Sequence, residues 1–102
     1  MRKAEIYQQG TLAGLLEETG PSQYRFTYLT AYQGEPISLA MPVRAAAYEF
    51  TGFPPVLEGL LPEGVQLEAL LRTYKVDKND LFKQLLLVGE DVVGALTIWE
   101  VK

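Results

Sequence analysis

The sequence has 102 residues, 48% hydrophobic and 22% charged, which fits one globular domain rather than a disordered tail. It contains no cysteine and no histidine, which excludes disulfide bonds, the usual zinc sites and the Ser-His or Cys-His pairs of nucleophilic enzymes. The net charge of −4, from 13 acidic and 9 basic residues, offers no basic stripe, so we expect no direct nucleic-acid contact.

The chain begins with the pattern of antiparallel strands joined by short turns. Residues 4–7 alternate, residues 8–10 favour a turn, and a second strand is predicted over 11–18. It ends in a Gly- and Pro-containing turn at 19–22. Two consecutive strands with so short a connection indicate a hairpin.

The next two predicted strands complete a meander. Tyr24, Phe26 and Tyr28 share one face of a strand over 24–29, and we expect the helices of the second half to cover that face. Residues 37–41 alternate again and end at a proline, which predicts a fourth strand that ends there or lies at an edge.

The second half of the chain turns helical. Residues 43–56 are predicted as a loop, followed by one short helical turn at 56–61. A helix should begin near Gly64, since four large residues fall at i, i+3, i+4 and i+7. These are Leu67, Leu70, Leu71 and Tyr74.

A second helix has a well-marked start and stop. Asp77 is the predicted N-cap, with Asp80 in the first turn, where negative charge is favourable. Val76 and Leu81 fit a hydrophobic staple, and Gly89 is the expected C′ residue.

The chain closes with a strand predicted over 92–101, in which Gly94 marks a bulge or a close backbone approach. The predicted architecture is therefore α+β: a small antiparallel β-sheet, made of a meander plus the C-terminal strand, with two α-helices packed on one side. Residues 1–102 form a single domain. No apolar run is long enough for a membrane span and no secretory signal is evident, so we expect a cytoplasmic protein.

Groups that could carry chemistry favour structural roles. Four carboxylates could form a metal or acid-base cluster, but two have helix-start roles and two fall in a predicted turn: Asp77, Asp80, Glu90 and Asp91. Four glycines match no phosphate-binding pattern: Gly59, Gly64, Gly89 and Gly94. We therefore predict no catalytic residue, no metal and no cofactor.

Two aromatic features leave alternatives open. The alternating Tyr24, Phe26 and Tyr28 could form a base-stacking platform, but Arg25 is the one cation among them and the net charge is unfavourable. A covered sheet face is the better interpretation. Trp99 fits either a half-buried edge residue or a partner contact.

The segment 51–64, TGFPPVLEGLLPEG, is the most informative part of the sequence. It is too short and too rich in proline for an ordinary core helix, yet it carries several large apolar residues. Part of them can cap the core, but five such residues on one broken segment are hard to bury together: Phe53, Leu57, Leu60, Leu61 and Val65. An apolar cluster with acidic surroundings is typical of a protein-binding surface, so the residues alone predict a binding module.

Five motifs in order resemble the N-terminal subdomain of HipA-type Ser/Thr kinase toxins. They are GTLAGLL, YRFTYL, PISLAMP, FPPVLEGLLPEG and LFKQLLLVGEDVVGALTI, the last containing a G-x-D-x-x-GA-L signature at Gly89, Asp91, Gly94, Ala95 and Leu96. The resemblance runs from about Ile6 to Ile98. None of the kinase motifs is present, so the chain is similar to the HipS proteins, the small members of three-component HipBST toxin–antitoxin systems.

This resemblance implies a partner and an activity. HipS proteins can act as antitoxins that bind and inhibit HipT, a HipA-like Ser/Thr kinase, while HipB is the helix-turn-helix DNA-binding member. By this resemblance the present chain is expected to be a non-enzymatic inhibitor of a HipT-like kinase. Two alternatives remain: a structural N-terminal subdomain of a HipA-type kinase, or an accessory member of a HipB-containing repressor complex that reaches DNA through its partners.

The expected contact lies in the proline-rich segment. We predict that a wedge formed by six consecutive residues enters the kinase near its small lobe: Leu60, Leu61, Pro62, Glu63, Gly64 and Val65. Phe53 and Leu57 are predicted to anchor this wedge beside the kinase.

Overall fold

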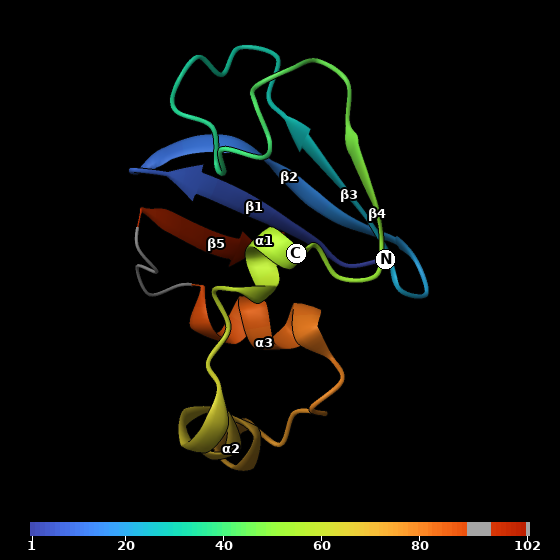
Figure 1. Ribbon diagram of the computed structural model, residues 1–102, viewed down its shortest axis with the longest axis vertical. Helices are drawn as coiled ribbons and strands as arrows, with labels where there is room; N and C mark the ends of the chain where they lie inside the picture. Colours follow the sequence, from blue (N-terminus) through green and yellow to red (C-terminus); the bar gives the residue numbers. More distant parts are fainter. Residues whose placement is uncertain (90–94, 102) are drawn as a thin grey trace.

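The computed structural model describes residues 1–89 and 95–101 (Figure 1). One five-stranded antiparallel sheet has the strand order β4-β3-β2-β1-β5. Its strands are β1 (Lys3–Gln8), β2 (Thr11–Gly20), β3 (Gln23–Tyr28), β4 (Tyr48–Thr51) and β5 (Leu96–Glu100). The helices are α1 (Pro55–Glu58), α2 (Gly64–Tyr74) and α3 (Leu81–Val88). The predicted α+β class is confirmed.

Local turn chemistry explains the first half of the sheet. The β1–β2 hairpin turns at Gln9 and Gly10, which both have positive φ, 51° and 83°. This pair is typical of two-residue hairpin loops, whose twist matches that of the strands. The C-terminal strand β5 returns to the free edge of β1, where Ile98 lies opposite Ile6. The first three predicted strands and the return of the last strand to the sheet are thus confirmed over the described residues.

The core lies between one face of the sheet and the helices α1 and α3 (Figure 1). Its largest fully buried apolar side chains come from every layer: Ile6, Leu16, Phe26, Ile98, Leu57, Phe82 and Leu85. The helix α2 contributes no buried residue and lies beyond α3 from the sheet. The direct cover of the sheet is therefore α1 and α3.

A loop covers the rest of the apolar sheet face, and here one prediction was wrong. Residues 37–41 do not form a strand but belong to an irregular loop over 29–47. The buried hydroxyl of Tyr28 accepts a hydrogen bond from the amide of Ile37 at 3.0 Å and donates to the carbonyl of Met41. The ring of Tyr32, in the same loop, stacks on that of Tyr28 at 5.8 Å. The Tyr28 hydroxyl thus supplies hydrogen bonds to backbone groups of Ile37 and Met41 that a neighbouring strand would otherwise supply.

The edge strand β4 was missed, because residues 43–56 were predicted as a loop. It pairs with β3, with Phe50 opposite Tyr24, and its half-buried Tyr48 and Phe50 alternate with the exposed Glu49 and Thr51. The alternation was readable in the sequence, but four residues are a weak signal beside an alanine run and two prolines.

The start of α3 also differs from the prediction. The N-cap is Asp80, whose carboxylate accepts from the amide of Lys83 at 3.2 Å, while Asp77 accepts from the amide of Asn79 in the preceding turn. With the cap moved by three residues, the predicted staple between Val76 and Leu81 no longer has the N′ and N4 positions. Both aspartates are capping residues by type, and only tertiary contacts select between them.

Gly89 ends α3 as predicted, but for a different reason. It has φ of −72°, which any residue adopts, so left-handed backbone is not what requires glycine. A Cβ atom here would lie 2.6 Å from the Cβ of Ile98, and the Gly89 carbonyl accepts from the Ile98 amide at 2.7 Å. Glycine lets α3 approach β5 closely. The predicted role of Gly94 lies outside the described residues.

Among residues 1–89 and 95–101, the longest helix has 11 residues, and none is both long and apolar enough to cross a bilayer.

Candidate partner-binding surface

The segment from Phe53 to Val65 links β4 to α2 through one short helix. Pro54 and Pro55 fix the start of α1, since proline is favoured at the first helical position. Beyond Gly59 the chain turns tightly, with the amide of Leu61 donating to the Glu58 carbonyl at 3.0 Å. Gly64, at φ of 59°, then begins α2 in the left-handed region that favours glycine.

Burial divides the eight predicted contact residues into three groups. Leu57 is 1% exposed and belongs to the core, so the prediction that it contacts a partner is wrong for this structure. The inward face of α1 buries it against the core formed with α3. Four residues are half-buried, namely Phe53, Leu60, Leu61 and Pro62. Glu63, Gly64 and Val65 are exposed, and Val65 is 81% exposed.

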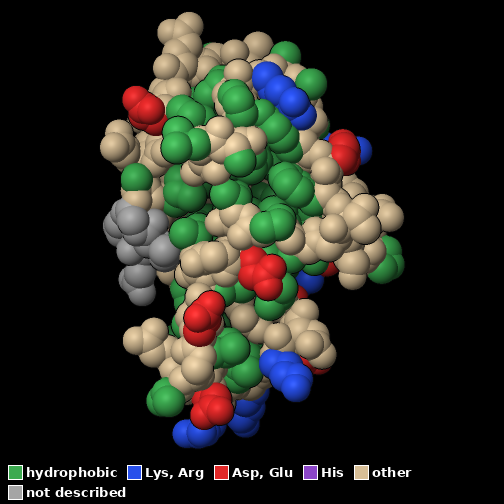
Figure 2. All heavy atoms as spheres, in the orientation of Figure 1, with side chains coloured by type: hydrophobic (Ala, Val, Ile, Leu, Met, Phe, Trp, Pro, Cys, Tyr) green, Lys and Arg blue, Asp and Glu red, His purple; other side chains and the backbone are tan. Residues whose placement is uncertain are grey.

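The half-buried residues continue an apolar surface that starts on β4. Phe53 packs edge-on against Tyr24, with ring centroids 5.3 Å apart at 82°, and this contact fixes its position. Six partly buried side chains pack against the core along this stretch: Tyr48, Phe50, Phe53, Val56, Leu60 and Leu61. Figure 2 shows hydrophobic side chains gathered over the sheet and the loop, with acidic side chains below them near α1.

The helix α2 extends this surface away from the core. Its predicted apolar face is real, but Leu67, Leu70 and Leu71 are only half-buried and Tyr74 is exposed. An amphipathic helix of 11 residues that buries none of them leaves much of its apolar face without cover. The turn of residues Leu60–Val65, hereafter the 60–65 turn, joins this helix to the core.

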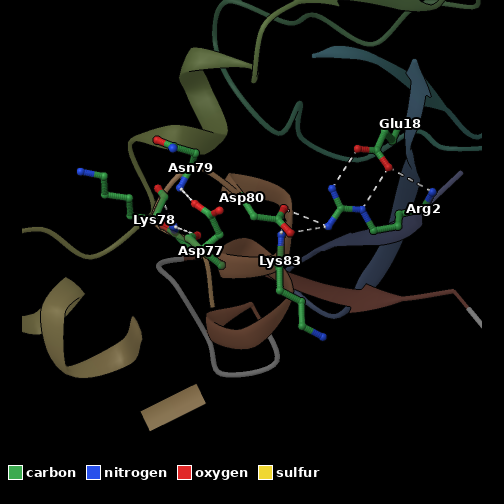
Figure 3. Close-up of polar contacts among 8 residues, drawn as sticks. Arg2, Glu18, Asp77, Lys78, Asn79, Asp80 and Lys83 are labelled. Carbon is green, nitrogen blue, oxygen red and sulfur yellow. Dashed lines mark hydrogen bonds and ion pairs between the residues drawn. The ribbon is translucent and has the colours of Figure 1, made fainter. Parts of the chain in front are cut away.

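A polar cluster ties the sheet to the start of α3 (Figure 3). The guanidinium of Arg2 donates to both oxygens of Glu18, at 3.0 and 2.8 Å, and to both oxygens of Asp80, at 2.9 and 3.0 Å. It also lies 5.0 Å from the centroid of the Phe82 ring. The hydrogen bonds from Arg2 lower the pKa of Glu18 below its ordinary value, while partial burial opposes this shift. Sequence reasoning missed Arg2, which gives no local signal at the start of a strand.

The carboxylates considered for a metal site have structural partners where the structure describes them. Asp77 holds the turn before α3, and Asp80 caps α3 and binds Arg2. Glu90 and Asp91 lie outside the described residues, as does part of the last sequence signature. Within residues 1–89 and 95–101, no group of three or more His, Cys, Asp or Glu residues could hold a metal ion.

Trp99 and Leu39 are exposed apolar side chains away from the 60–65 turn. Trp99 lies on the edge strand β5 and is 45% exposed, more than the half-buried position predicted, and a partner contact stays open. Leu39 is 96% exposed and belongs to the loop over 29–47. Sequence reasoning missed Leu39 because it placed the residue in a strand.

Comparisons with known proteins agree with one another. The family described as HipA N-terminal domain matches residues 4–99. An uncharacterized protein of Haemophilus influenzae (strain Rd) is 31% identical over 102 residues, which cover 100% of this chain and 95% of that protein. The solved structure titled N-terminal domain of HipA toxin is 27% identical, with a TM-score of 0.79, over 100% of this chain and 94% of the other.

Proposed function

Because this chain belongs to the HipA N-terminal domain family, we propose that it is a non-catalytic antitoxin that binds a HipA-like Ser/Thr kinase toxin and inhibits it. In this role it corresponds to the HipS proteins, and its partner corresponds to HipT. The 60–65 turn, anchored by Phe53, is the part that contacts the kinase.

One observation carries this proposal: the 60–65 turn projects an exposed Val65 from an otherwise half-buried apolar surface. Leu60 and Leu61 pack against the core, so a side chain held by this turn loses less freedom on binding than one on a free loop, and more of its burial energy goes to affinity. Hot spots cluster near the centre of an interface, where they are well packed and fully desolvated, and the residues around them exclude water.

A small protein built almost entirely of this fold has a precedent among the relatives. The match spans 95% of the Haemophilus influenzae relative, which leaves that protein no room for a kinase domain. The family therefore includes at least one small protein in which this fold stands almost alone. That precedent supports the antitoxin role for the present chain.

The inhibition follows from the conditions for phosphoryl transfer. A protein kinase needs its Gly-rich loop, its Lys–Glu ion pair and its metal-binding Asp in place together. A protein that binds the inactive arrangement more tightly shifts the population toward it by that difference in affinity. A difference of about 3 kcal/mol in favour of the inactive state gives more than a hundredfold shift in the equilibrium.

A second role as an accessory member of a HipB-containing repressor complex has one supporting observation. Leu39, which is 96% exposed on the loop over 29–47, offers a second protein contact. The acidic net charge of −4 favours contact with a DNA-binding partner rather than with DNA.

Co-expression with a HipA-like Ser/Thr kinase toxin tests the proposal. We expect growth to be restored, the two proteins to co-purify, and autophosphorylation of the purified kinase to fall as the chain is added. Loss of growth with no co-purification, from a chain shown to be folded, would contradict the antitoxin role. A gel shift with this chain alone should show no DNA binding even at low salt.

A further inference from the structure

A small groove lies behind the 60–65 turn, between that turn, α2 and the start of α3. Its volume is about 160 Å³, and its apolar lining comes from Leu61, Pro62, Leu67 and Leu81. A cavity of about 150 Å³ holds a benzene-sized group, whereas pockets for small-molecule ligands usually exceed about 300 Å³. The groove therefore has the size for one side chain of another protein rather than for a metabolite.

The charged groups at the groove favour a particular charge on the partner residue next to the bound side chain. Glu58 and Glu63 line it and are both exposed, and among the described residues no ion pair joins either one to a cation. Lys78 lines the groove from the chain before α3. A partner cation beside the two glutamates would gain attraction that the chain itself does not provide.

A buried amide adds a third requirement. Gln84 is 1% exposed and lines the groove, and its amide nitrogen donates to the carbonyls of Asp77 at 3.3 Å and Lys78 at 3.0 Å. These two bonds fix which end of the amide is nitrogen. Among the described residues no hydrogen bond reaches the amide oxygen of Gln84, so this oxygen can accept an N–H from a bound chain.

From these three features we propose that the groove is the docking site for a basic, apolar segment of the kinase. One leucine-sized side chain fills the apolar lining, a lysine or arginine next to it pairs with Glu58 and Glu63, and a backbone N–H bonds to Gln84. This inference rests on the proposed function, because it takes the kinase as the partner, and it adds the sequence chemistry that the kinase segment should have.

The test is an NMR titration of the full ¹⁵N-labelled chain with the peptide acetyl-Lys-Arg-Leu-Leu-Arg-Lys-amide. We expect saturable shifts at the amides of Leu61, Leu67, Leu81 and Gln84. A peptide with serine in place of both leucines, or glutamate in place of all basic residues, should bind at least tenfold more weakly. Absence of shifts at millimolar peptide, or shifts confined to other surfaces, overturns the proposal.

Charge reversal provides the matched control. Glu58→Lys/Glu63→Lys should weaken the basic peptide about tenfold and strengthen the glutamate peptide. Glu35→Lys/Glu100→Lys makes the same change in net charge at two exposed residues away from the groove and should leave both affinities unchanged. Equal effects of the two double variants show a net-charge effect and overturn the proposal.

Kinase assays separate the failure of this inference from the failure of the proposed function. If the wild-type chain inhibits the kinase and Glu58→Lys/Glu63→Lys inhibits it equally, the groove assignment is wrong and the antitoxin role stands. If the wild-type chain does not bind the kinase, the antitoxin role fails whatever the peptide does. Groove shifts that appear on concentrating the chain alone identify a second copy as the occupant and overturn the proposal.

Discussion

Arg2 and Asp80 are 78 positions apart in the sequence, yet the Arg2 guanidinium donates to both carboxylate oxygens of Asp80 at 2.9 and 3.0 Å. Asp80 is at the same time the N-cap of α3. The residue that precedes β1 thus bonds directly to the residue that starts α3, one of the helices that cover the sheet. The ion pair between Arg2 and Asp80 thus holds the N-terminus of α3 against the sheet.

Asp80→Ala should lower the free energy of unfolding by about 1–3 kcal/mol, because it removes an N-cap and an ion pair together. Asp80→Ser keeps a capping oxygen and should recover about half of that loss. The matched control is Asp77→Ala, whose carboxylate accepts from the exposed Asn79 amide and whose loss should cost under about 1 kcal/mol. Urea denaturation measures all three, and a larger effect at Asp77 would place the cap there instead.

The Arg2–Glu18 pair should make stability depend on pH at the acid end. Hydrogen bonds from Arg2 lower the pKa of Glu18 in the folded state below the value of about 4.3 expected in the unfolded chain. Its contribution is therefore present above about pH 4.3 and is lost as the pH falls through the folded-state pKa.

Glu18→Gln should accordingly cost about 1–2 kcal/mol at pH 7 and less at pH 3. Denaturation at the two pH values measures the difference. The exposed Glu68→Gln is the control, with an effect under about 0.5 kcal/mol at both. A Glu18→Gln effect that is the same at pH 3 and pH 7 would rule out this ion pair as its source.

Two glycines with the same helix-ending backbone provide a test of close packing. Gly89 and Gly59 end α3 and α1 with φ of −72° and −63°, but a Cβ would meet Ile98 at 2.6 Å in the first case and nothing nearer than 3.7 Å in the second. Gly89→Ala should destabilise the fold by about 1–3 kcal/mol, since the packed core must shift. Gly59→Ala should be neutral or stabilising by up to about 1 kcal/mol. Thermal denaturation checks both, and equal effects would contradict the α3–β5 contact.

Leu57 and Val65 are eight positions apart and should behave in opposite ways. Leu57→Ala should cost about 2–5 kcal/mol of stability, because it leaves a cavity where the side chain was 1% exposed. Val65→Ala should change stability by under about 0.5 kcal/mol, since its side chain is 81% exposed. If chemical denaturation shows similar losses for both, the assignment of Leu57 to the core is wrong.

The proposed wedge is tested by Leu60→Ala/Val65→Asp. We expect this double variant, shown to be folded by circular dichroism, to bind the kinase about thirtyfold to a thousandfold more weakly, a loss of about 2–4 kcal/mol. Calorimetry and the phosphorylation assay measure binding and inhibition. Leu39→Asp, at the most exposed apolar residue, is the control and should inhibit like the wild type. A folded double variant that neutralises the kinase fully would exclude the 60–65 turn as the contact.

Much of the fold could be predicted because its signals are local. The alternation of Tyr24, Phe26 and Tyr28 located β3, and all three are buried as expected, although α3 covers Tyr24 while the loop over 29–47 covers Tyr28. Helical spacing located α2 and its apolar face. The periodicity of a strand or a helix is a property of neighbouring residues, so it can be recognised without knowledge of the rest of the chain.

The wrong predictions of a strand over 37–41 and of the α3 N-cap arose where the local sequence fits two structures equally well. Residues 37–41 alternate like a strand, but the hydroxyl of Tyr28 binds their backbone. Asp77 and Asp80 are both capping residues, and the contact with Arg2 accompanies the cap at Asp80. In each case the deciding contact comes from outside the local pattern, 9 to 13 positions away for Tyr28 and 78 positions away for Arg2.

The sequence by itself determined the α+β class, the order of most elements and the apolar character of the segment 51–65. Only the tertiary structure decided that Leu57 is buried while Val65 is exposed, and that Arg2 meets Asp80. The physical reason is that the hydrophobicity of a side chain gives only the free energy favouring its removal from water. Which surface covers that side chain depends on how the elements pack. The candidate site could therefore be located from the sequence as a segment, and its contact residues could be chosen only from the fold.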